Sequence, residues 1–176
     1  MMRNSLKDKF RLFLYHRIPL LETVLLMFLF YMPINFFDLH NVRPVVGVIC
    51  IYYWTLKRRY MFGYASAFCI GFLMDIYSST PLGINVLTMM LLVLITDVIS
   101  RYFKAASFSV NWLVFSLVCM AICFIKWIIF YLYFTKFLPV KEVLLNLFST
   151  IMFYPIVVFI NVWVQNNILP KERINE

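Results

Sequence analysis

Long runs of apolar residues alternate with short polar or basic segments along this chain of 176 residues. About 20 mainly apolar residues form a helix long enough to cross the hydrocarbon core of a membrane. The pattern therefore predicts an all-α, polytopic membrane protein with six transmembrane helices. The expected spans cover residues 18–37, 42–56, 60–77, 84–100, 108–134 and 143–168.

The second run, residues 42–56, is the shortest and needs a separate argument. At 1.5 Å per residue its helix covers only about 22 Å, so a re-entrant segment is the alternative to a full crossing. Pro44 stands at its start, where a missing N–H group does no harm, and the basic triplet 57–59 follows its end. Basic loops favour the cytoplasmic side, and we therefore predict that this run crosses.

The N-terminal segment, residues 1–17, is basic, and its apolar residues recur at helical spacing. This pattern predicts a short basic amphipathic helix on the cytoplasmic surface. The apolar run that follows is too long for a signal peptide and lacks a small-residue cleavage site, so we expect an uncleaved first span. Pro33 is expected to bend that span near its outer end, and Pro155 to kink the sixth.

The chain is 64% hydrophobic and 14% charged, which excludes an ordinary soluble domain. Its net charge of +8 does not indicate nucleic-acid binding, because the basic residues lie at the edges of apolar runs. On the six-helix topology, twelve of the 16 Lys and Arg residues fall on one side, three on the other and Lys126 within a span. We therefore predict a single domain, residues 1–176, with both termini in the cytoplasm.

The most specific stretch, residues 63–83, reads GYASAFCIGFLMDIYSSTPLG. Gly63 and Gly71 are about two helical turns apart, so we expect both on one face, where they allow another helix to approach closely. Asp75 follows on the same side, and a turn with no Lys or Arg is closed by Pro81, Leu82 and Gly83. Gly83→Leu should strain this turn if Gly83 needs a positive φ. The alternative for Asp75 is an acid that caps the end of a helix near the interface.

Four ionisable residues fall within or near the predicted spans, and they are Glu22, Asp75, Asp97 and Lys126. We expect Glu22 and Asp97 near the interface, and the spacing of Asp97 and Arg101 permits an ion pair on one helix. Counting along the helices places Asp75 and Lys126 in the outer third of the membrane. Because an isolated charge is costly in hydrocarbon, we predict that these two residues pair, and a proton or substrate site is the alternative.

Chemistry-bearing groups are otherwise sparse. Each of the four cysteines lies inside an apolar run, and no His or further Cys stands near Cys119 and Cys123 to complete a metal site. Asn161 and Gln165 are one turn apart and are expected to hydrogen-bond a neighbouring helix or a partner. No nucleophile–base pair or phosphate-binding loop is present in the sequence. We therefore predict no catalytic residues, no metal site and no cofactor.

The series formed by Pro44, IYYWTLKRRY at 51–60, Gly63, GFLMD at 71–75 and PLG at 81–83 resembles the MreD family of rod-shape-determining proteins. The resemblance implies a protein without enzymatic activity in the bacterial inner membrane, as a multi-pass subunit of the cell-elongation machinery for peptidoglycan synthesis. It implies MreC as partner and, through MreC, MreB, RodA and a class B penicillin-binding protein. It also implies a six-helix fold similar to the substrate-binding subunits of energy-coupling-factor transporters. Lys126 departs from the family pattern.

Two functions from different classes follow from these observations. The first is a scaffold whose helix-packing or partner-interaction residues are Gly63, Gly71, Asp75, Pro81, Leu82, Gly83 and Lys126. The second is a small-molecule binding or transport subunit with a pocket near Asp75 and Lys126. A direct pair with no cavity beside it would argue against the second function. In both cases the surroundings are the lipid bilayer, and nucleic acid is not a partner.

Overall fold

The computed structural model of the protein describes residues 6–31, 44–60, 62–78, 80–103, 107–134 and 139–168, with side chains described in these ranges except at 6–16 and 31. All the regular secondary structure in these ranges is helical, so the expected all-α class is confirmed. The helices are α1 (Leu6–Tyr31), α2 (Val46–Arg58), α3 (Tyr64–Ser78), α4 (Ile84–Phe103), α5 (Phe108–Phe134) and α6 (Val140–Asn167).

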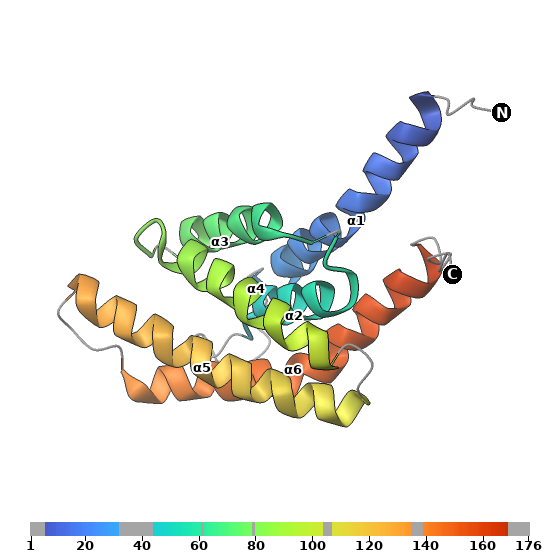
Figure 1. Cartoon of the computed structure of the whole chain (residues 1–176). Helices are drawn as coiled ribbons and strands as arrows, with labels where there is room; N and C mark the ends of the chain where they lie inside the picture. Colours follow the sequence, from blue (N-terminus) through green and yellow to red (C-terminus); the bar gives the residue numbers. More distant parts are fainter. Residues whose placement is uncertain are drawn as a thin grey trace.

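The six helices lie in three layers (Figure 1). The central layer contains α2 and α4, which pack against each other. One outer layer contains α1, which packs on α2, and α3, which packs on α4; the other contains α5 and α6. The α3–α4 turn lies at the same end of the molecule as the end of α5 and the start of α6 (Figure 1). The beginning of α1 and the ends of α4 and α6 lie at the opposite end.

The core is centred on α2, a helix that is apolar on every side. All of its residues except Lys57 are buried, and Trp54 and Tyr52 are fully buried. A helix that is hydrophobic all round must be covered all round, and α1, α4 and α6 supply this cover. Next to Tyr52, the rings of Phe115 and Tyr154 stack with centroids 4.4 Å apart and join α5 to α6.

The helices differ in length and in how apolar they are. In the described residues, α4, α5 and α6 are long and apolar enough to cross a membrane, whereas α3 is an apolar helix of only 15 residues. With 13 residues, α2 extends for about 20 Å, less than the thickness of the hydrocarbon core. Three of the six predicted crossings therefore have the expected helix, and the crossings by α1, α2 and α3 stay predictions.

Helix boundaries agree best with the sequence at α5. The predicted span 108–134 coincides with α5. The predicted surface helix and the first span form one continuous helix, α1, with Pro19 inside it and the Thr23 hydroxyl donating to the Pro19 carbonyl at 2.7 Å. Pro155 lies inside α6, which changes direction along its length (Figure 1). The bend predicted at Pro33 falls outside the described residues.

Candidate functional site

The carboxylate of Asp75 holds together the turn between α3 and α4. Asp75 lies in the last turn of α3 and is only 1% exposed. Its oxygens accept hydrogen bonds from the Thr80 hydroxyl (3.0 Å), the Gly83 N–H (2.8 Å) and the Asn85 N–H (3.0 Å). The first N–H groups of a helix lack partners within it and carry partial positive charge. Asp75 therefore caps the N-terminus of α4 from the neighbouring helix, as the capping alternative proposed.

Pro81, Leu82 and Gly83 form the turn itself. Gly83 has a φ of +109°, which residues with a side chain rarely adopt, so a larger residue at this position would strain the turn. The carbonyl oxygen of Gly83 accepts the N–H of Leu87 at 2.8 Å and so continues into the first turn of α4. The side chain of Leu82 is 70% exposed.

Gly71 brings the backbones of α3 and α4 together, as predicted. A methyl group at Gly71 would place its carbon 2.6 Å from Cα of Val86 and 3.0 Å from the carbonyl oxygen of Asn85. Both atoms belong to the backbone of α4, so a side chain at this position would hold the helices apart.

Gly63 does not share this packing face, and the prediction of a common glycine face is wrong. Gly63 precedes Tyr64, the first residue of α3, so the helical spacing on which the prediction rested does not apply. Among the described residues beyond its own chain neighbours, no atom lies within 4 Å of the position that a Cβ would take at Gly63.

Lys126 of α5 joins the turn through Asn85 rather than through Asp75. Its Nζ donates a hydrogen bond to Oδ1 of Asn85 at 2.7 Å, and Nδ2 of Asn85 donates to the Thr80 hydroxyl at 3.0 Å. The Thr80 hydroxyl donates in turn to Asp75. The predicted direct pair of Asp75 and Lys126 is therefore wrong, because Asn85 bridges the two charges. They still belong to one hydrogen-bonded network that links α3, α4 and α5.

The pattern of apolar runs does not single out Asn85 and Thr80, the two bridging members of this network. Both carry a short polar side chain close to the expected start of a helix at residue 84. Such side chains commonly satisfy the first N–H groups of a helix or bond to the residues that do so. Their position is the signal by which they could be recognised.

Asp97 has a different partner from the one that its spacing suggested. Its Oδ1 lies 2.6 Å from Nε of Arg59, and this ion pair connects the segment after α2 to α4. Arg101, four residues after Asp97, is exposed. The pair expected within one helix is therefore replaced by one between two segments.

The polar side chains of α6 face α2. The Tyr53 hydroxyl donates to Gln165 at 2.7 Å, and the Cys50 thiol lies 3.9 Å from the side-chain amide of Asn161. The prediction that Asn161 and Gln165 bond to a neighbouring helix is thus confirmed. Glu22 was expected near the interface, yet both of its carboxylate oxygens are buried without a hydrogen-bond partner among the described residues.

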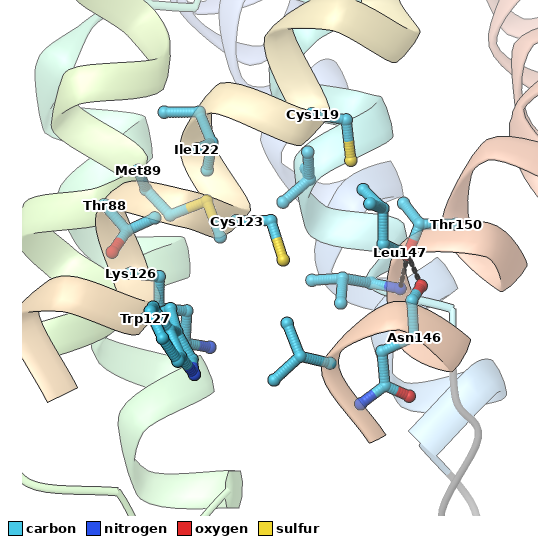
Figure 2. A pocket seen from close by; sticks show the side chains of 13 residues that line it. Thr88, Met89, Cys119, Ile122, Cys123, Lys126, Trp127, Asn146, Leu147 and Thr150 are labelled. Atoms are coloured by element: carbon cyan, nitrogen blue, oxygen red, sulfur yellow. Dashed lines mark hydrogen bonds between the residues drawn. The ribbon is translucent and has the colours of Figure 1, made fainter. Parts of the chain in front are cut away.

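A cavity of about 150 Å³ lies beside Lys126, enclosed by α2, α4, α5 and α6. Its lining is mainly apolar. Figure 2 shows Lys126 and Trp127 on one side, Asn146 and Thr150 on the other, and the sulfur of Cys123 facing the space between them. Apolar walls with a few polar groups are typical of sites for small molecules. Through Lys126 the cavity adjoins the network of the α3–α4 turn.

In the described part of the chain, no group of three or more His, Cys, Asp or Glu side chains could hold a metal ion. The polar groups of the turn are instead hydrogen-bonded to one another. These bonds fix the positions of α3, α4 and α5 relative to one another.

Comparison with known proteins gives one match. The family model described as rod shape-determining protein MreD matches residues 10–161. No curated protein sequence and no solved structure matches the chain. The expected similarity to substrate-binding subunits of energy-coupling-factor transporters therefore stays a prediction.

Proposed function

The chain belongs to the MreD family of rod shape-determining proteins, and from this premise we propose that it is a non-enzymatic scaffold subunit of the bacterial cell-elongation machinery. In this role it binds the bitopic partner MreC in the inner membrane. Through MreC it keeps MreB, RodA and a class B penicillin-binding protein in one complex for peptidoglycan synthesis.

The engagement of Asp75 is the observation that supports a scaffold most strongly. A buried carboxylate is the group in this chain best suited to proton or substrate chemistry. Here its oxygens receive one hydroxyl and two backbone N–H donors. Hydrogen bonds of this kind fix the side chain in place. Asp75 accordingly serves the shape of the bundle, which a partner protein then recognises.

We further propose that all six helices cross the membrane and that both termini are cytoplasmic. The short α2 is compatible with this because it is covered by protein rather than lipid, so its length need not match the bilayer. Cysteine labelling tests the topology in a variant without native cysteines. Leu82→Cys should react with an impermeant maleimide from outside, and Tyr60→Cys only after the cells are opened. Reaction of both from one side would contradict the proposal.

We place the contact with MreC at the α3–α4 turn, outside the hydrogen-bonded network. Of the residues predicted to pack or to meet a partner, Gly71, Asp75 and Gly83 are engaged within the protein, whereas Leu82 is 70% exposed. Leu82→Gln should lower the recovery of MreC in a pull-down. Leu132→Gln is the matched control, because Leu132 is 73% exposed on α5. Equal recovery with both variants would remove the contact from the turn.

Depletion in a rod-shaped host tests the proposed function itself. Cells that lose this protein should become round, and fluorescent labelling of new cell wall should lose its distribution along the cylinder. Cells that keep their rod form and their pattern of wall insertion would refute the scaffold.

A further inference from the structure

We propose that the cavity beside Lys126 and the groove between α5 and α6 form one site for an anionic lipid-like molecule, with its headgroup at Lys126 and its hydrocarbon chain in the groove. This site is a property of the bundle itself and does not depend on MreC.

Lys126 makes few polar contacts for an ammonium group. Its ammonium group has three N–H donors, and the one hydrogen bond it makes with described residues goes to the neutral amide of Asn85. The carboxylate of Asp75, which belongs to the same network, is already held by its own three donors. Among the described residues, the ammonium group of Lys126 therefore has no directly bonded counter-charge, and it lies in a helix that is long and apolar enough to span a membrane. Such a charge is costly, and a bound anion would offset part of that cost.

The space in front of Lys126 is elongated. The cavity of about 150 Å³ continues into a groove of about 240 Å³ between α5 and α6. Both are lined by the same four residues at their junction, namely Cys123, Trp127, Val143 and Leu147. For scale, an engineered apolar cavity of about 150 Å³ in another protein binds benzene. The joined space is therefore large enough for part of a hydrocarbon chain.

The groove between α5 and α6 opens at the outer surface of these two helices. Apart from the four shared residues, its lining consists of Met120, Phe124, Val140 and Leu144, which are all half-exposed or more. These side chains belong to two helices that are apolar and long enough to span the membrane, so the groove faces lipid rather than water. Its chemistry fits an alkyl chain that enters from the bilayer.

These three features together select the class of ligand. The apolar groove requires a hydrocarbon chain, and Lys126 requires one negative charge at the inner end of that chain. Asn146 and Thr150, which line the opposite wall in Figure 2, add polar surface around a headgroup. A phosphodiester of a membrane phospholipid and the carboxylate of a free fatty acid both satisfy these requirements, so the test contains an arm for each.

Thermal unfolding of the purified protein in a neutral detergent tests the proposal. Phosphatidylglycerol, oleate, phosphatidylcholine and inorganic phosphate are added separately. We expect phosphatidylglycerol or oleate to raise Tm by about 3 °C or more over phosphatidylcholine, because a ligand that binds only the folded state stabilises it. Inorganic phosphate should have no effect, because it lacks a chain. A response to phosphatidylglycerol alone identifies a phospholipid site, and a response to oleate alone identifies a fatty-acid site.

Three variants locate the response. Lys126→Met should abolish it by removing the charge. Cys123→Trp should abolish it by filling the junction of cavity and groove, and it leaves the hydrogen bond of Lys126 to Asn85 in place, so it serves even if Lys126→Met does not fold. Arg101→Met is the charge-matched control, because Arg101 is exposed at the end of α4, and it should respond like wild type. Equal shifts with phosphatidylcholine and the anionic lipids, or a wild-type response in Cys123→Trp, would overturn the proposal.

Discussion

The α3–α4 hairpin and the α5–α6 pair each consist of two antiparallel helices, but the contacts between the helices differ in the two pairs. In the hairpin, Gly71 lets the backbones touch, and Asp75 satisfies the first N–H groups of α4. In the pair, large side chains such as Phe124 and Leu144 stand half-exposed along a groove. Helices in lipid associate through close contact and hydrogen bonds, so the hairpin should be the rigid part and the α5–α6 pair the adaptable one.

The largest effect expected from this difference is at Gly71. Gly71→Ala places a methyl carbon against the backbone of α4, which cannot move aside as a flexible side chain can. We expect a loss of about 3 kcal/mol in the free energy of unfolding, the upper part of the range for overpacking. Gly63→Ala is the matched control and should change it by less than about 0.5 kcal/mol, because the space there is open. Chemical denaturation in detergent measures both, and equal losses would show that the hairpin is not closely packed.

The next effect concerns Asp75 and tests how its charge is linked to Lys126. Asp75→Asn keeps the shape of the side chain but weakens bonds to backbone N–H groups, so we expect a loss of about 2 kcal/mol. Lys126→Met should cost less, because Lys126 makes a single hydrogen bond in the network. The coupling energy from a double-mutant cycle should be about 0.5–1 kcal/mol and should vanish in an Asn85→Ala background. Coupling that survives Asn85→Ala would mean that the charges interact without the amide.

The smallest effect is expected in the α5–α6 pair. Cys123→Leu adds volume to a side chain that lines the cavity and groove, so the free energy of unfolding should change by no more than about 0.5 kcal/mol. Ala67→Leu adds volume to a residue of α3 that is fully buried, and overpacking should cost about 1–3 kcal/mol there. Similar losses in the two variants would remove the contrast between a rigid hairpin and an adaptable pair.

Sequence predicts the helix bounds of this protein best at α5. The bounds of α5 match the apolar run because that helix is exposed along most of its length and its ends coincide with changes in polarity. For α2 the polarity pattern is less informative, because protein surrounds the helix and its ends depend on contacts with α1, α4 and α6. Uncertainty in a helix start also explains the wrong prediction for Gly63. This residue lies one position before α3, the helix on which its predicted face depended.

The sequence identifies several residues of the polar network around Asp75, but it does not predict which of them bond to one another. Asp75, Gly83 and Lys126 stand out because a charge or a glycine at those positions needs a physical reason. The bridge through Asn85 depends on how α5 packs against α4, which no spacing within one helix encodes. The ion pair of Arg59 and Asp97 also could not be predicted from spacing, because the two residues are 38 positions apart in the sequence and yet lie 2.6 Å apart in the structure.

The central claim, that this member of the MreD family acts as a scaffold for MreC, is tested most directly by affinity purification in mild detergent followed by quantitative mass spectrometry. We expect MreC to be recovered in a fixed ratio with the wild-type protein and with Gly63→Ala. Gly71→Ala, which disturbs the hairpin, should lower this recovery per molecule of folded protein. Folded wild-type protein that is recovered without MreC would contradict the claim.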